Sequence, residues 1–336
     1  MTKRIGINGF GRIGRQVLRA ICERYKGNIE VVGINDLFPA ETNAHLLKYD
    51  SNYGNYPGLI EIKNGNLIVD GQEIYISSEK DPGAIRWKDL GVEVVIESTG
   101  VFTDANKAKA HIDSGGAKKV IISAPAKNED ITIVLGVNGN KYDPSQHRVI
   151  SNASCTTNGL APVAKVLFDR FGIQKGLLTT VHAYTNTQRL QDLAAKDMRD
   201  ARSAAQNIVP SPTGAAKAVG LVIPELQGKF GGMAFRVPTP TVSVIDFTAT
   251  LEKLASPDQI RDAMLEYGND SMKGILSVTD EPLVSTDLKG STFSSIFSSV
   301  DTIVIENMVK VVAWYDNEWG YACRTADLTA IIANKI

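Results

Sequence analysis

The chain has 336 residues, 43% of them hydrophobic and 22% charged, which is typical of a globular protein large enough for two domains. Its 36 basic residues nearly balance 37 acidic ones, and this net charge of −1 gives no support for a nucleic acid or a membrane surface as primary partner. No apolar run is long enough to cross a bilayer, and no secretory signal is evident, so we expect a cytoplasmic protein. Three sparse cysteines argue against a disulfide framework, and four histidines show no metal-site spacing, so we expect no metal.

The first part of the chain alternates predicted strands and helices. A strand over residues 3–8 leads through a glycine-rich turn into a helix that continues to residue 23. Short apolar runs follow at 29–34, 92–96 and 120–122, as expected of strands covered on both faces, and a helix is expected over 104–114. This alternation predicts an α/β fold with a parallel, doubly wound Rossmann sheet.

The pattern changes after residue 151. Residues 241–251 and 309–314 alternate apolar and polar side chains, which indicates half-buried antiparallel strands. The polar segment 184–210 is expected to be a long ordered loop, and such loops are usually functional. Helices are expected at 159–170, 212–219, 257–266 and 320–334. We therefore predict a dinucleotide-binding domain at 1–151, an α+β domain with a mostly antiparallel sheet at 152–317, and a last helix at about 318–336 that packs back on the first domain.

The turn after the first strand has the spacing of a dinucleotide-binding loop. Gly9 permits a tight turn, Gly11 lets the backbone approach a pyrophosphate, and Gly14 lets helix and strand pack closely. Asp36, at the end of the next strand, would accept hydrogen bonds from ribose hydroxyls and repel a 2′-phosphate, which favours NAD over NADP. A glycine turn in another α/β fold is the alternative. The expected cofactor-binding residues are Gly9, Gly11, Arg12, Ile13, Gly14 and Asp36.

A candidate nucleophile lies in the second half of the chain. Cys155 sits among small polar residues where a helix begins, and a helix N-terminus lowers the pKa of a thiol. His182, after an apolar strand, is the candidate base, although a satisfied core histidine is an equally good interpretation of its spacing. The remaining cysteines and histidines favour structural or surface roles: Cys22, Cys323, His45, His111 and His147.

Six segments together resemble phosphorylating glyceraldehyde-3-phosphate dehydrogenase over essentially the whole chain. They are INGFGRIGR at 7–15, SNASCTTN at 151–158, TVHAYT at 180–185, PTGAAKAVG at 212–220, RVPTP at 236–240 and WYDNEWGY at 314–321. The resemblance implies that Cys155 attacks an aldehyde to form a thiohemiacetal, that His182 takes the proton, and that hydride transfer to NAD leaves a thioester for inorganic phosphate to attack. It also implies a homotetramer.

The resemblance assigns further binding residues. Thr185, Thr187 and Arg236 match a substrate-phosphate site, and the inorganic-phosphate site is matched by Ser154, Thr156, Thr213 and Gly214. Lys80, Ser123 and Asn317 match positions along the cofactor.

Two departures from the family pattern stand out. Gly159 replaces a second cysteine that many members carry, so we expect no resolving thiol there for an oxidised Cys155. Residues 193–195 keep a leucine but lack a nearby proline, which leaves strict NAD preference open. The alternatives are erythrose-4-phosphate dehydrogenase, or a nucleotide-binding or RNA-binding protein with secondary catalysis.

Overall fold

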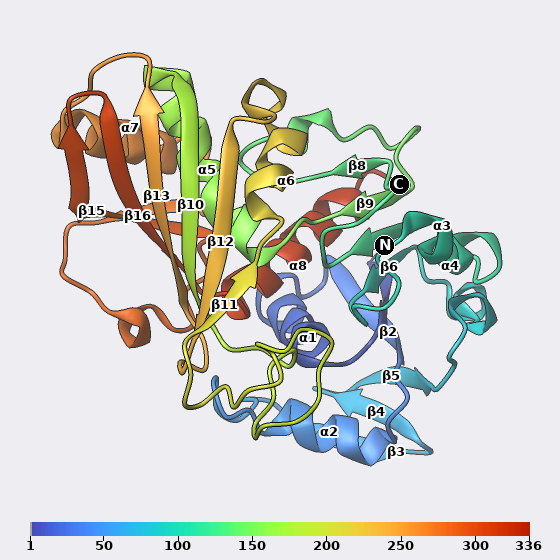
Figure 1. Cartoon of the computed structure of the whole chain (residues 1–336). Coiled ribbons are helices and arrows are strands. Elements are labelled where there is room, and N and C mark those ends of the chain that lie inside the picture. Colours follow the sequence, from blue (N-terminus) through green and yellow to red (C-terminus); the bar gives the residue numbers. More distant parts are fainter. Residues whose placement is uncertain (1) are drawn as a thin grey trace. The chain divides into compact units, whose positions relative to one another are not determined.

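The computed structural model describes residues 2–336 and divides into two compact units (Figure 1). One unit comprises the chain up to Ile133 together with Asn140–Ala153 and Ala322–Ile336, and the other comprises Val134–Gly139 and Ser154–Tyr321. None of the helices within residues 2–336 is long and apolar enough to span a bilayer.

The first unit is built on a sheet that holds nine strands within the described residues, in the order β3-β4-β5-β2-β1-β6-β7-β9-β8. Its pairs are parallel, apart from the antiparallel β3–β4 and β4–β5. The strands are β1 Lys3–Asn8, β2 Ile29–Asn35, β3 Ile60–Lys63, β4 Asn66–Val69, β5 Gln72–Ser77, β6 Val94–Glu97, β7 Lys119–Ile122, β8 Ile131–Thr132 and β9 Val149–Ser151.

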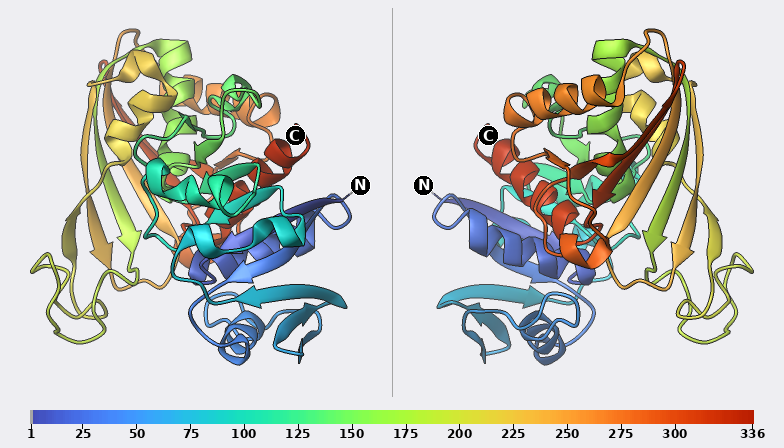
Figure 2. Two further views of the ribbon diagram at one scale, coloured as in Figure 1. Left: turned by 90° about the vertical axis from the view of Figure 1, so that its right-hand side faces the viewer. Right: turned by 90° about the vertical axis from the view of Figure 1, so that its left-hand side faces the viewer.

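Helices cover both faces of this sheet. The chain leaves β1 toward β2 on one side and later returns to β6 on the other, so the strand order reverses between β1 and β6. Right-handed crossovers then place successive helices on opposite faces. Figure 2 shows α1 and α8 on one face and α3 with α4 on the other. The helices are α1 Arg12–Arg24, α2 Ala40–Lys48, α3 Ala105–Ala108, α4 Ala110–Asp113 and α8 Trp319–Ala333.

The second unit contains a seven-stranded sheet within the described residues, in the order β11-β12-β10-β13-β16-β15-β14. Four of its pairs are antiparallel, while β10–β12 and β14–β15 are parallel. The strands are β10 Ile173–Ala183, β11 Val209–Pro212, β12 Phe230–Val237, β13 Ser243–Leu251, β14 Leu276–Thr279, β15 Ser295–Ile305 and β16 Met308–Tyr315. The predicted fold class, a Rossmann domain followed by an α+β domain, is confirmed.

The helices of the second unit lie against one face of its sheet (Figure 2). They are α5 Cys155–Phe171, α6 Ala215–Val222 and α7 Pro257–Asn269. Burial alternates strictly along β13, as the sequence pattern predicts for a strand with one covered face. Residues 184–208 form no helix and contain a single isolated bridge, between Arg189 and Ser203.

Three helix predictions were wrong in their boundaries. The helix expected over 104–114 is broken at Lys109 into α3 and α4. The helix expected at 159 begins at Cys155, because the Ser154 hydroxyl caps it by accepting from the Thr157 amide at 3.0 Å. The helix expected over 212–219 is shifted to 215–222, because Pro212 is paired with Met233 in the sheet.

Candidate active site

The nucleophile candidate is the first residue of α5. Before it the chain turns sharply at Ala153, which has a φ of +55°, a left-handed conformation that costs energy for a residue with a side chain. The Ser154 cap then aligns the first turn of α5, and the half-buried Cys155 side chain is presented at the amide end of the helix. The peptide dipoles of this helix favour negative charge on the sulfur.

Strand β10 brings the candidate base to this cysteine. The Nε2 atom of His182 lies 3.5 Å from the Sγ atom of Cys155. Strand β12 runs parallel to β10 and pairs Arg236 with His182, and the Nη1 atom of Arg236 lies 2.6 Å from the Nδ1 atom of His182. The structure therefore gathers Cys155, His182 and Arg236 into one group, in which His182 has the thiol as a direct neighbour.

Burial and the Arg236 charge set the protonation states of this group. They lower the pKa of His182 to about 3, so the imidazole is neutral at physiological pH. Burial also raises the pKa of the Cys155 thiol, while the Arg236 charge and the Thr156 hydroxyl act in the opposite direction. The expectation of a lowered cysteine pKa was therefore wrong for this state of the protein, because desolvation outweighs the helix terminus.

The two contacts of His182 Nδ1 require different tautomers. The Ala183 carbonyl oxygen, at 2.7 Å, accepts a hydrogen bond only if Nδ1 carries the proton. The Arg236 guanidinium has only donors, so its bond to Nδ1 requires the proton on Nε2. A base acting on Cys155 needs a free lone pair on Nε2, which the first tautomer provides and the second does not.

Tyr315 completes the group, and sequence reasoning missed it. Its hydroxyl lies 2.9 Å from the Thr156 hydroxyl and 2.8 Å from that of Thr180, and its ring contacts the His182 ring edge-on. It joins the start of α5 to the strand that carries His182. The only sequence signal was the segment WYDNEWGY, from which Asn317 alone was selected; its Oδ1 atom accepts from the Ser243 hydroxyl at 2.8 Å.

The proposed anion-binding residues fall into separate local contacts. The hydroxyls of Thr185 and Thr187 lie 2.9 Å apart, just after β10. The Nε atom of Arg236 is buried and has no hydrogen-bond partner within residues 2–336, so the guanidinium retains a donor for a ligand. Thr213 accepts from the Ala215 amide at 3.2 Å, and Gly214 precedes α6 with open space where a Cβ atom would lie.

The glycine-rich loop has the geometry of a dinucleotide cradle. Gly9 has a φ of +89°, and a Cβ atom on Gly14 would lie 2.2 Å from the Gly9 carbonyl oxygen, so neither position accepts a larger residue. Gly11 has no atom within 4 Å of a Cβ position, which leaves the helix N-terminus open to a pyrophosphate. This loop therefore fits the pyrophosphate of the dinucleotide that the sequence predicts.

Acidic residues position this loop from two sides. Asp36 accepts from the Phe10 amide at 2.8 Å and from the Phe38 amide at 3.0 Å, so its carboxylate is fixed beside the loop. The Arg12 side chain forms an ion pair with Asp50, which sequence reasoning did not select, and these contacts lower the pKa of that carboxyl. Lys80 is exposed, and the Ser123 hydroxyl donates to the Glu97 carbonyl oxygen at 3.1 Å.

The other cysteines differ from Cys155. Cys323 is fully buried in α8, and burial raises its pKa to about 12. Burial also raises the pKa of Cys22 in α1. A buried, protonated thiol is a poor nucleophile, which supports structural roles for both.

Comparison with known proteins identifies the family. The model of the glyceraldehyde 3-phosphate dehydrogenase NAD binding domain matches residues 3–105, and that of the C-terminal domain matches residues 154–317. The glyceraldehyde-3-phosphate dehydrogenases of Geobacillus stearothermophilus and Priestia megaterium are 56% and 55% identical to the chain, over all of it and 99% of their own lengths. Glyceraldehyde-3-phosphate dehydrogenase 1 of Bacillus subtilis is 53% identical over the same shares. The chain belongs to the glyceraldehyde-3-phosphate dehydrogenase family, whose members bind NAD.

Proposed function

We propose that this chain is a glycolytic and gluconeogenic enzyme that oxidises and phosphorylates D-glyceraldehyde 3-phosphate to 1,3-bisphosphoglycerate through a covalent intermediate on Cys155. The observation that carries the covalent step is the 3.5 Å contact between Cys155 Sγ and His182 Nε2. It places a neutral imidazole within reach of the thiol proton, which is the arrangement that activates a nucleophilic cysteine.

The chain's own residues account for the proton and acyl transfers. Cys155 sulfur adds to the aldehyde carbon, and His182 takes the thiol proton and returns it to the former carbonyl oxygen, which gives a thiohemiacetal and leaves His182 neutral again. His182 then accepts the hydroxyl proton of that adduct as its carbon is oxidised to a thioester. When bound, NAD supplies the hydride acceptor for this oxidation. Phosphate oxygen adds to the thioester carbon, and the carbon–sulfur bond breaks to release the acyl phosphate and the Cys155 thiolate.

Arg236 connects substrate binding to the tautomer of His182 in this proposal. The buried Nε atom of Arg236 and the paired hydroxyls of Thr185 and Thr187 are suited to a phosphate monoester. In this proposal the substrate phosphate accepts from Nη1 of Arg236 as well as from Nε, so Nη1 no longer donates to His182 and Nδ1 is free to donate to Ala183. Substrate binding then favours the tautomer in which Nε2 acts as the base.

The remaining binding residues are assigned from the motifs that the chain shares with its family and, for the glycine-rich loop, from its geometry. The attacking phosphate is assigned to Ser154, Thr156, Thr213 and Gly214, at the start of α5 and just before α6. The cofactor is assigned to Gly9, Gly11, Arg12, Ile13, Gly14, Asp36, Lys80, Ser123 and Asn317.

We also infer that the enzyme works in the cytoplasm as a homotetramer. All three cysteines are free, as suits a reducing compartment. The segment 184–208 exposes Leu190, Met198 and Ile208 by 80%, 86% and 67%, and an interface between subunits would cover such apolar side chains. Sedimentation equilibrium of the purified protein measures the assembly.

Replacing the sulfur tests the covalent mechanism. Cys155→Ser is expected to lower kcat about 1,000-fold or more, because a neutral hydroxyl is a far weaker nucleophile than a thiolate. NADH formation from aldehyde, NAD and phosphate measures it, and calorimetric binding of NAD to the variant shows that the cofactor site persists. Cys22→Ser is the matched control and should retain activity. Full turnover by Cys155→Ser would refute the mechanism, and comparing kcat/KM for glyceraldehyde 3-phosphate and erythrose 4-phosphate decides the substrate.

A further inference from the structure

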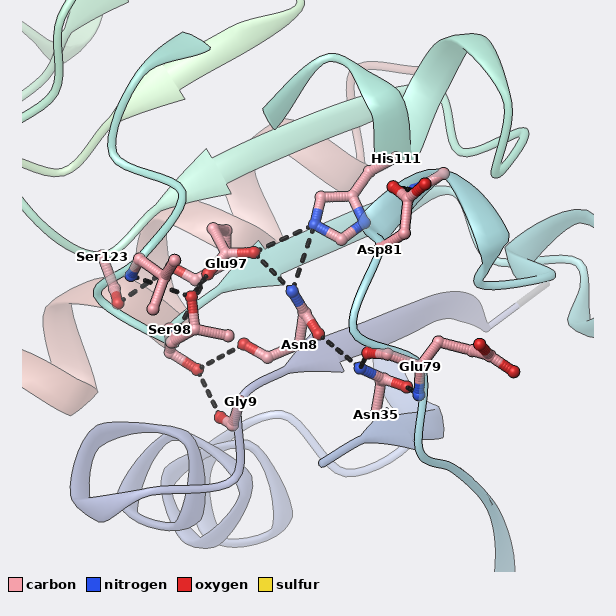
Figure 3. A network of polar contacts seen from close by, with 12 residues as sticks. Asn8, Gly9, Asn35, Glu79, Asp81, Glu97, Ser98, His111 and Ser123 are labelled. Atoms are coloured by element: carbon pink, nitrogen blue, oxygen red, sulfur yellow. Dashed lines mark hydrogen bonds and ion pairs between the residues drawn. The ribbon is translucent and has the colours of Figure 1, made fainter. Parts of the chain in front are cut away.

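A buried polar network lies beneath the dinucleotide cradle in the first unit, and the proposed mechanism makes no use of it (Figure 3). Its centre is the Glu97 carboxylate at the end of β6, with a side chain that is 1% exposed. The carboxylate accepts from Asn8 Nδ2 at 2.6 Å, His111 Nε2 at 2.9 Å, and both the amide and hydroxyl of Thr99 at 2.9 and 2.5 Å. Four donors compensate for the loss of water around this buried group.

The tautomer of His111 follows from its other partner. Trp87 Nε1, which can only donate, lies 3.0 Å from His111 Nδ1, so Nδ1 accepts and the ring proton lies on Nε2. His111 therefore donates to Glu97 as a neutral imidazole. His111 is fully buried in α4, so of the structural and surface roles expected for it, the structural one agrees with the fold. A polar stretch of sequence gave no sign that this histidine faces the sheet.

The network extends from Glu97 to the segments that form the proposed cofactor site. Asn8 precedes Gly9, and a Cβ atom on Gly9 would lie 2.6 Å from the Thr99 amide nitrogen, so Thr99 fits directly against the glycine turn. The side-chain oxygen of Asn8 accepts a hydrogen bond at 2.8 Å from the side-chain amide of Asn35, the residue before Asp36. Asn35 in turn accepts from the Glu79 amide at 2.8 Å.

Two further contacts link Ser123 and Gly9 to the end of β6. The backbone carbonyl of Glu97 accepts from the Ser123 amide at 2.9 Å. The Ser98 hydroxyl donates to the Gly9 carbonyl oxygen at 2.7 Å. The network thus lies where the strand order reverses between β1 and β6, which is where doubly wound sheets bind their ligands.

We propose that Glu97 and His111 are positioning residues for NAD, which hold the glycine turn, the Asp36 strand end and the Ser123 strand end in the geometry that the cofactor requires. This inference rests on the cofactor site proposed above. Neither side chain needs to touch NAD. Their effect is to pre-order separate loops, so that binding does not have to supply the free energy of ordering them.

The experiment is a calorimetric measurement of NAD affinity in the full-length protein. Glu97→Gln replaces one acceptor oxygen by an NH2 donor. In one orientation of the amide this NH2 group faces the donors of Asn8 and His111, and in the other it faces those of Thr99. We expect the Kd for NAD to rise about tenfold or more, with the KM for the aldehyde and kcat at saturating NAD changed by less than about threefold. Wild-type affinity in folded Glu97→Gln would overturn the proposal.

Further variants separate positioning from stability. Val120→Ala removes buried volume from β7 of the same sheet without touching the network, and it should keep the wild-type Kd for NAD. An equal rise in Kd for Val120→Ala would show a merely structural effect and overturn the proposal. The increases in the Kd for NAD caused by Glu97→Gln and His111→Asn should not multiply in the double variant, because both substitutions disrupt the same network.

Thr99→Val covers the case in which Glu97→Gln does not fold. It keeps the shape of the side chain but removes one donor, and a smaller rise in Kd is expected; an unchanged Kd would overturn the proposal. If the wild-type protein itself did not bind NAD, the proposed cofactor site would fail instead, so the two failures are distinguishable.

Discussion

At the scale of single residues, the same chemical group acquires its role from its surroundings. His182 and His111 are both buried and neutral, yet one faces a thiol and the other a carboxylate. Cys155 and Cys323 differ in the same way, because only Cys155 lies at a helix N-terminus next to an imidazole. Residue type alone does not distinguish the two histidines or the two cysteines from each other.

The glycine-rich loop offers a test with a matched pair of variants. Gly14→Ala would force a Cβ atom to within 2.2 Å of the Gly9 carbonyl oxygen, so it should lower the free energy of unfolding by about 1–3 kcal/mol and weaken NAD binding. Gly11→Ala meets open space and should stay within about 1 kcal/mol of wild type. It should nevertheless weaken NAD binding about tenfold or more, because the pyrophosphate approaches that backbone. Urea denaturation and calorimetry measure both, and unchanged NAD binding by Gly11→Ala would contradict the assignment.

At the scale of elements, helix ends were the features that pattern reading placed least well. The residues at 155–158 are weak helix formers, so the apolar periodicity predicted a helix that begins too late. In the structure the helix begins at Cys155, where Ser154 caps it. This difference matters for function, because a cysteine inside the first turn receives the full effect of the terminal amides. Strand periodicity was a better guide, since β13 lies within the alternating segment 241–251.

Helix α7 provides a test of capping on a helix away from the proposed site. The Ser256 hydroxyl accepts from the Gln259 amide at 3.2 Å, and the Gln259 side chain accepts from the Ser256 amide at 2.9 Å, which forms a capping box. Ser256→Ala should lower the free energy of unfolding by about 1 kcal/mol, and Ser256→Gly by only a few tenths. Chemical denaturation measures the difference, and equal stability of all three proteins would show that the cap contributes nothing. Turnover should not change.

At the scale of the whole molecule, two sheets of different construction hold different groups of the candidate residues. The parallel sheet ends in loops suited to a dinucleotide, and the mostly antiparallel sheet places a histidine and an arginine side by side on neighbouring strands. Each unit contains a buried hydrophobic cluster of its own.

The buried imidazole of His182 predicts how global stability depends on pH. Its pKa is about 3 in the folded protein and near the ordinary 6.5 when unfolded, so below 6.5 the unfolded chain binds the extra proton. The contribution of His182 to the free energy of unfolding is fully present above pH 6.5 and decreases as the pH drops toward 3. Between about pH 6.5 and about pH 5 the wild type should lose about 2 kcal/mol more than His182→Gln. Urea denaturation at both pH values checks this, and equal losses would contradict a buried neutral His182.

The sequence by itself determined the features that local patterns encode: the glycine turn, a cysteine near a helix start, and the class of each sheet. These follow from spacing along a few neighbouring residues, whereas the family followed from the resemblance of six segments along the whole chain. Only the tertiary structure decided that His182 meets Arg236, that Tyr315 joins α5 to β10, and that Glu97 and His111 form a network under the cofactor cradle. Such contacts depend on strand register and on burial, and desolvation in particular reversed the expected pKa shift of Cys155, because no local pattern measures how much water a fold removes.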